Sequence, residues 1–290
     1  MRTALTLLVM AASLLCAPVA MALSEYGIEG MGVVSTKAAE GRTSVSPDGQ
    51  RIVFASDRAG GAGGWDLWQA RLLEGRWQAA HPLQLNGAHD DVDPYFSHDG
   101  RWLLFASNRA GGFALYRAPV SAKGEVGTPE RLQGPAHSVA ERSPALNAQG
   151  TWLLYSRHDA EGGWNLYAAP LAGDTRGASR ALEALNTAAD ERSADWLGTQ
   201  GAVIFSRGEG DRAQVWHAAC AFAGSEVRAL GLSFNTAEGF TEAPVVDAAK
   251  PTELLVSSRS ARSPRAGGTD VYRLVTPQLA ALPACLPATR

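Results

Sequence analysis

The stretch Ser46–Arg58, SPDGQRIVFASDR, recurs with small changes as Phe96–Arg109, FSHDGRWLLFASNR. Each copy contains a turn, then an apolar run that ends in serine, and then an arginine. Asp-Gly pairs favour tight hairpin turns because both central positions tolerate positive φ. The apolar run does not alternate with polar residues, which is typical of a strand covered on both faces. The stretch therefore predicts a β-hairpin whose second strand is buried.

The apolar run occurs five times at intervals of about 50 residues, at 51–56, 102–107, 152–156, 202–206 and 253–257. An arginine follows every copy: Arg58, Arg109, Arg157, Arg207 and Arg259. A third strand follows each copy, and a weaker fourth strand follows the first four. Repeats of this length and strand content are typical of propeller blades. We predict an all-β chain that forms a β-propeller of five four-stranded antiparallel blades, with six blades as the less favoured arrangement.

The Pro-Asp-Gly form of the repeat resembles the WD-like repeat of the TolB-type β-propeller family of bacterial envelopes. The resemblance extends over about residues 40 to 275 and implies the propeller fold, although blades of this kind occur in proteins of many functions. TolB-type proteins have six blades and an additional α/β domain, whereas this chain shows five repeats and has no length left for that domain. We therefore do not extend the partners of the TolB family to this chain.

The first 22 residues have the features of a secretory signal peptide. Arg2 provides the positive start, residues 4–19 are apolar, and Ala20 to Ala22 match an A-x-A cleavage site. Leu15 stands before Cys16, where a lipid-attachment signal has a small residue. We therefore expect cleavage near Ala22, a periplasmic or secreted protein, and no transmembrane segment in the mature chain.

The remaining chain divides into an N-terminal segment, 23–39, a propeller, 40–275, and a C-terminal tail, 276–290. The fifth repeat lacks a fourth strand of its own. Gly32–Thr36 is our candidate for the strand that closes the ring and removes its open edge, and a strand from the tail is the alternative. Cys220 and Cys285 either form a disulfide, which the compartment permits, or are two separate buried thiols.

The composition excludes several classes of protein. Of 290 residues, 46% are hydrophobic, and 26 basic side chains face 29 acidic ones, for a net charge of −3. This length suffices for a large core, and this charge leaves no basic surface for nucleic acid. The sequence has no cofactor motif, and its histidines show no metal-ligand spacing. We expect a folded monomer without nucleic acid, metal or cofactor.

An acidic residue stands near the start of the first strand in four copies: Glu40, Asp91, Glu141 and Glu191. Asp93 adds a further acid in the second copy. First strands line the channel of a propeller, so these acids would form a ring at its mouth that binds a cation or a basic or hydroxyl-rich ligand. In the alternative, each acid pairs with the repeat arginine, since the hairpin register places Glu141 opposite His158 and next to Arg157. Because the acids repeat, we favour this structural role.

Aromatic residues recur at the start of the third strands, among them Trp65, Phe113 and Trp164. Their equivalent placement favours packing between blades. Trp65 and Trp164 directly follow Gly-Gly turns, so these two are our candidates for a surface on which sugars stack.

The sequence contains no signature of a known reaction centre. We therefore predict a noncatalytic propeller, a scaffold that binds an envelope protein or a small ligand such as a carbohydrate. The alternative is a five-bladed glycosidase-like hydrolase that uses unlike carboxylates from Asp91, Asp93, Glu141 and Glu191. Acids paired one by one with arginine would favour binding, and two unpaired carboxylates about 5 to 10 Å apart in an open pocket would favour hydrolysis.

Overall fold

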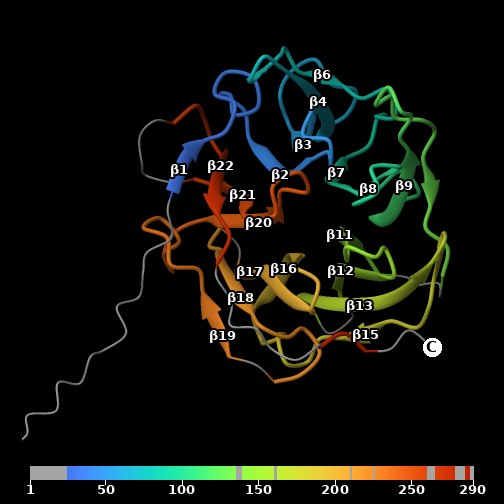
Figure 1. Ribbon diagram of the computed structural model, residues 1–290, viewed down its shortest axis with the longest axis vertical. Helices are drawn as coiled ribbons and strands as arrows, with labels where there is room; N and C mark the ends of the chain where they lie inside the picture. The colour runs from blue at the N-terminus through green and yellow to red at the C-terminus, as the bar shows by residue number, and fades with distance from the viewer. Residues whose placement is uncertain are drawn as a thin grey trace, which may run out of the picture.

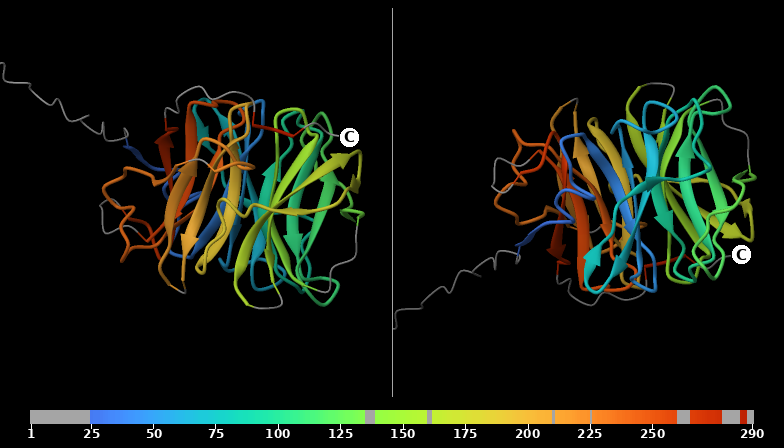
Figure 2. Two further views of the ribbon diagram at one scale, coloured as in Figure 1. Left: turned by 90° about the horizontal axis from the view of Figure 1, so that it is seen from below. Right: turned by 90° about the horizontal axis from the view of Figure 1, so that it is seen from above.

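The computed structural model describes residues 25–134, 139–159, 162–209, 211–224, 226–259, 265–277 and 285–287. Within these ranges the regular elements are all strands, and no helix is long and apolar enough to cross a membrane. Five antiparallel sheets stand around a central axis (Figure 1), and the side views show their strands running roughly along that axis (Figure 2). The predicted all-β propeller with five blades is confirmed. The proposed signal peptide lies outside the described residues.

Each blade is an antiparallel sheet whose first strand is innermost and whose outermost strand is short (Figure 1). Blade 1 contains β2 (Glu40–Val45), β3 (Arg51–Ser56), β4 (Asp66–Leu73), β5 (Arg76–Trp77) and β6 (His81–Pro82). Blade 2 contains β7 (Asp91–Phe96), β8 (Trp102–Ser107), β9 (Ala114–Pro119) and β10 (Glu130–Arg131). Blade 3 contains β11 (Glu141–Leu146), β12 (Trp152–His158), β13 (Trp164–Ala172), β14 (Thr175–Arg176) and β15 (Arg180–Ala181). Blade 4 contains β16 (Asp190–Leu197), β17 (Ala202–Gly208), β18 (Gln214–Ala218) and β19 (Val227–Ala229). Blade 5 contains β20 (Thr241–Val246), β21 (Glu253–Ser258), β22 (Asp270–Val275) and β1 (Glu25–Ile28).

The second strand of each blade supplies much of the core. An aromatic side chain occupies the same position of the second strand in four blades, and all four are fully buried: Phe54, Phe105, Tyr155 and Phe205. These strands are covered on both faces because side chains of neighbouring blades meet between the sheets. Burial of each such side chain contributes about 1.5–3 kcal/mol to folding. The apolar runs of the sequence are thus the layers that hold adjacent blades together.

A strand from the N-terminal segment closes the ring. β1 pairs antiparallel with β22, and Ile28 lies opposite Tyr272. The expected closing segment, Gly32–Thr36, is not a strand, so that prediction was wrong in its residues. Gly30 and Gly32 have φ values of 53° and 82°, and they turn the chain so that Val34 donates a backbone hydrogen bond to the Gly30 carbonyl. The valines that suggested a strand are held in this turn instead.

A disulfide between Cys220 and Cys285 fastens the tail to blade 4, with the two Cα atoms 5.6 Å apart. Next to it, the backbone N–H of Cys285 donates to the carbonyl of Gln200, and Leu286 packs against the main core. The tail therefore contacts blade 4 through a covalent bond, a hydrogen bond and an apolar side chain.

We expect Cys285→Ser to lower the free energy of unfolding by about 2–4 kcal/mol, because the bridge restricts the unfolded chain over a separation of 65 residues. Urea unfolding followed by tryptophan fluorescence measures this loss. The wild-type protein in a reducing agent is the matched control and should lose a similar amount. Equal midpoints for the oxidised wild type and the variant would contradict this role of the bridge.

Candidate functional site

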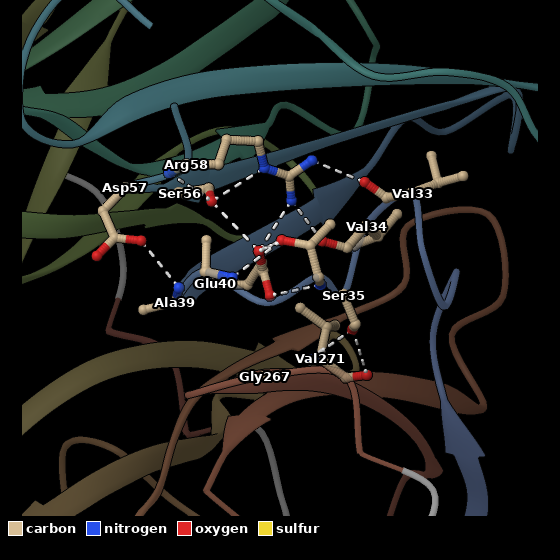
Figure 3. A network of polar contacts seen from close by, with 12 residues as sticks. Val33, Val34, Ser35, Ala39, Glu40, Ser56, Asp57, Arg58, Gly267 and Val271 are labelled. Carbon is tan, nitrogen blue, oxygen red and sulfur yellow. Dashed lines mark hydrogen bonds and ion pairs between the residues drawn. The ribbon is translucent and has the colours of Figure 1, made fainter. Parts of the chain in front are cut away.

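The four repeated acids are buried inside the blades. Glu40, Asp91 and Glu191 are 0% exposed and Glu141 is 4% exposed. Figure 3 shows the first of these sites, where Arg58 donates to Glu40 over 2.9 Å and to the carbonyls of Val33 and Val34. The acid therefore ties the first strand of blade 1 to the loop that follows β1.

Blades 2 and 4 repeat this arrangement. Arg109 lies 2.6 Å from Asp91, and Arg207 lies 2.8 Å from Glu191. The guanidinium of Arg207 also lies over the rings of Phe205 and Trp216, a contact that favours a cation. In these blades the pairing of acid and repeat arginine is as the structural alternative predicts. Among the described residues no three His, Cys, Asp or Glu side chains gather as metal ligands would.

Blade 3 departs from the predicted pairing. Glu141 pairs with Arg176 of β14 over 2.8 Å, and both side chains are nearly inaccessible to solvent. Arg157 pairs instead with Asp159 over 2.9 Å and lies over the ring of Tyr167. The expected pair of Glu141 and Arg157 is therefore wrong, because Arg176 competes for Glu141 and Asp159 competes for Arg157.

Blade 5 has Thr241 where the other blades have an acid. Its hydroxyl forms a hydrogen bond with that of Ser258. The repeat arginine of this blade, Arg259, lies over the ring of Phe240 and is 3.4 Å from the exposed Asp211. Among the described residues, blade 5 therefore has no buried ion pair at the position where its neighbours have one.

A β-bulge in every first strand changes which residues face the channel. The ladder shifts by one residue, so that Asp91 lies opposite Ser107 and Glu141 opposite Arg157, where the hairpin count predicts Asn108 and His158. In four blades the bulge contains a residue in the left-handed region: Asp93, Ser143, Ser193 and Ala243, with φ between 53° and 57°. A bulge adds one residue and re-aims its neighbours. Glu40, Asp91, Glu141 and Glu191 are therefore buried inside the blades and do not form the predicted ring, and of the five predicted acids Asp93 alone is among the described residues that line the channel.

The channel holds a cavity of about 360 Å³. Two consecutive residues of every first strand line it: Gly41 and Arg42, Val92 and Asp93, Arg142 and Ser143, Arg192 and Ser193, and Glu242 and Ala243. Trp65, Phe113 and Trp164 also line it, from the start of the third strands. First and third strands of a blade begin at the same end, so these rings lie at the end where the first strands start. The site is thus amphipathic, with aromatic side chains toward one end of the channel and charged side chains along its wall.

The cavity breaks the symmetry of the repeat. The position after the repeated acid is Gly41, Val92, Arg142, Arg192 and Glu242 in successive blades. Blades 1 and 2 therefore present a small or apolar residue there, and blades 3 to 5 a charged one. A position that only supports the fold is expected to repeat, as the acids do, whereas recognition of an asymmetric ligand requires different residues around the ring. This departure from the repeat was the available sequence signal, and our reading of the sequence missed Arg42, Arg142 and Arg192.

One ion pair inside the cavity is complete. Arg142 donates from Nε to Asp93 over 2.9 Å, and Asp93 also accepts from the backbone N–H and the hydroxyl of Ser143. Burial opposes ionisation of Asp93, but the Arg142 charge and these hydrogen bonds outweigh it and lower its pKa. Asp93 is therefore a firmly held carboxylate that keeps its bulge in place.

Two further charges in the cavity have no such partner. Among the described residues, neither Arg192 nor Glu242 forms a side-chain hydrogen bond or an ion pair within 4 Å, although both are only half-buried in the wall. Burial raises the pKa of Glu242, and the charges of Arg192 and Arg142 oppose that rise. An unpaired cation and an unpaired carboxylate in one cavity are polar groups available to a ligand.

We expect Glu242→Gln to raise the free energy of unfolding at pH 7, because this half-buried carboxylate is more costly to ionise in the folded chain than in the unfolded one. The pKa of Glu242 lies above its ordinary value of 4.5, so the gain is full above the folded-state pKa and disappears below pH 4.5. Urea unfolding of both proteins at pH 7 and pH 4 measures this difference. A variant less stable than the wild type at pH 7 would show that Glu242 supports the fold.

Comparisons with known proteins identify the fold. No family model and no curated protein matches the sequence. The endo-arabinase from Bacteroides thetaiotaomicron VPI-5482 superposes with a TM-score of 0.56 at 15% identity, over 87% of this chain and 99% of that one. The putative TolB from Agrobacterium tumefaciens gives 0.54 at 12% identity, over 83% and 91%. TolB from Acinetobacter baumannii gives 0.49 at 18% identity, over 69% of this chain and only 43% of its own length.

Fold and site together define a class: a five-bladed β-propeller whose central cavity is asymmetric and is lined by aromatic and charged side chains. Its solved neighbours include a putative TolB and an endo-arabinase. A fold shared by such different proteins does not decide the function, so the function has to be argued from the cavity.

Proposed function

We propose that this chain is a noncatalytic binding propeller of an extracytoplasmic compartment and that its central cavity binds a small carbohydrate. The observation that carries the proposal is the break in repeat symmetry at the cavity, where the rings of Trp65 and Trp164 occur with the unpaired Arg192 and Glu242. Binding sites typically combine apolar and aromatic walls with a few convergent polar groups, in volumes of about 300–1,000 Å³.

A sugar ring can contact both the aromatic and the charged side chains of the cavity wall. One of its faces is apolar and stacks on an aromatic ring, and its hydroxyl groups both donate and accept hydrogen bonds. A carboxylate such as Glu242 accepts from hydroxyl groups, and a guanidinium such as Arg192 donates to them. The two side chains follow each other at the same position of blades 4 and 5, so one bound ring could reach both.

The state of the acids favours binding over hydrolysis. The four repeated acids are buried with arginines, and Asp93 is bound by Arg142. Asp90, at the cavity wall, accepts the backbone N–H of Trp65 and the amide of Asn108. Among the described cavity residues, this leaves Glu242 as the carboxylate without a hydrogen bond. Glycoside hydrolysis ordinarily requires a pair of carboxylates, one on each side of the bond.

The proposed compartment rests on two features of the sequence and structure. Residues 1–22 have the pattern of a cleavable secretory signal, and Cys220 and Cys285 form a disulfide. Disulfides persist in oxidising compartments such as the periplasm and the extracellular space.

Isothermal titration of the mature protein with a panel of neutral and acidic mono- and oligosaccharides tests this proposal. We expect a saturable response to at least one of them and no cleavage product after prolonged incubation. Trp164→Ala should weaken that binding about tenfold, because it removes a stacking ring. Trp102→Ala, which removes a ring that Arg117 covers elsewhere on the molecule, is the matched control and should not weaken it.

Two results would overturn the proposal. Absence of binding across the panel would remove the carbohydrate from it. Release of a shortened sugar that Glu242→Gln abolishes would favour the hydrolase.

A further inference from the structure

Arg42 is a buried cation with unused donors in the cavity wall. The side chain is 1% exposed, and Nη2 donates to the carbonyl of Ala194 over 3.1 Å. Neither Nε nor Nη1 has a hydrogen-bond partner in the described part of the chain. A buried donor without an acceptor is unfavourable, and more so when it belongs to a charged group. The fold thus maintains a guanidinium with two nitrogen atoms unsatisfied at this point.

The contact with Ala194 brings Arg42 to β16, the strand that also carries Arg192. Arg42 belongs to β2 of blade 1, whereas Ala194 belongs to β16 of blade 4, so the side chain reaches across the ring. Ala194 lies two residues after Arg192, whose Nε is likewise buried without a partner. Arg42 therefore reaches the strand that carries Arg192, and three nitrogen atoms of these two guanidinium groups have no hydrogen-bond partner among the described residues.

The nearby acids do not satisfy these donors. Burial lowers the pKa of Arg42, and the charges of Asp195 and Asp93 counter this effect. The oxygens of Asp195, however, accept the backbone N–H groups of Trp196 and Val246, and Asp93 is bound by Arg142. Both carboxylates make the region around Arg42 more negative, but their oxygens form hydrogen bonds to groups other than Arg42.

We infer that the carbohydrate bound in this cavity is acidic, with its carboxylate directed to Arg192 and Arg42 while its ring stacks on the aromatic end of the cavity. This inference rests on the proposed function and adds the chemical class of the sugar. A carboxylate offers several acceptor lone pairs and a full negative charge to a guanidinium, so it supplies what the unmatched N–H groups lack. A neutral sugar supplies acceptors but no charge.

Paired probes test the inference: glucuronate against glucose, and galacturonate against galactose, each titrated into the full mature chain at constant ionic strength. We expect each acidic sugar to bind at least tenfold more tightly than its neutral counterpart. Arg192→Gln should weaken binding of the acidic sugars much more than binding of the neutral ones and bring that ratio close to one. Arg228→Gln, which removes an exposed arginine paired with Glu226, is the matched control and should keep the preference.

The outcomes separate this inference from the proposed function. Equal affinity for acidic and neutral sugars, or a preference that survives in Arg192→Gln, overturns the inference and leaves the carbohydrate site standing. Acetate that binds as tightly as glucuronate shows a site for anions without recognition of a sugar, and it overturns the inference. Absence of binding for all four sugars and for their oligosaccharides overturns the inference together with the proposed function.

Discussion

A chain that begins at residue 30 is expected to melt at least about 10 °C below a chain that begins at residue 25. Only the longer chain retains β1, which covers the edge of β22. Its loss removes a strand ladder and opens the ring, and we expect this to lower the free energy of unfolding by about 4 kcal/mol or more. For a domain of this size 1 kcal/mol corresponds to about 2–4 °C. Differential scanning calorimetry of the two chains measures the difference.

The expected size of this effect follows from the contacts at the closure. Glu29, which follows β1, binds both Arg273 of β22 and the indole N–H of Trp77 in blade 1. Burial disfavours the Arg273 charge, yet Glu29 and Asp247 outweigh it and raise the pKa of Arg273. Loss of Glu29 leaves this network with fewer acids and exposes the β22 edge. Equal melting temperatures for the two chains would mean that the ring is stable without its closing strand.

Glu191→Gln is expected to lower the free energy of unfolding by about 3–5 kcal/mol, the usual cost of removing one partner of a buried ion pair. Glu191 is fully buried, and it accepts from Thr187 as well as from Arg207. Urea unfolding measures the loss. When Glu191→Gln is introduced into the Arg207→Gln variant, it should lower the free energy of unfolding much less than it does in the wild type, because the ion pair is already broken. Strictly additive losses would show that the two side chains act independently.

The repeat could be found from sequence because its determinants are local. Turn glycines, apolar runs and the spacing between them define each hairpin within about 20 residues, and the runs at 51–56 and 102–107 coincide with β3 and β8. The closing strand depends on a contact between residues 25–28 and 270–275, which no local pattern contains. For the same reason the sequence left open which end of the chain would complete the fifth blade.

The candidate site was only partly predictable. Ion pairing of Glu40, Asp91 and Glu191 follows from their repetition. The partner of Glu141 was predicted wrongly because its actual partner, Arg176, belongs to no repeated position. In blades 2 to 5 no glycine marks the bulge, and its left-handed residues include Asp93 and Ala243. Without the bulges the wrong residue of each first strand is assigned to the channel. Trp65 and Trp164, by contrast, were candidates for sugar stacking, and both line the cavity.

We expect the repeated residues to stabilise the blades and the variable residues to bind a ligand. The most direct test is a calorimetric titration of Glu242→Gln with the tightest-binding neutral sugar of the panel, alongside Glu191→Gln at a temperature where both are folded. The account predicts at least about tenfold weaker binding for Glu242→Gln, and affinity within about twofold of wild type for the less stable Glu191→Gln. Unchanged binding in Glu242→Gln, or an equal loss in both variants, would contradict it.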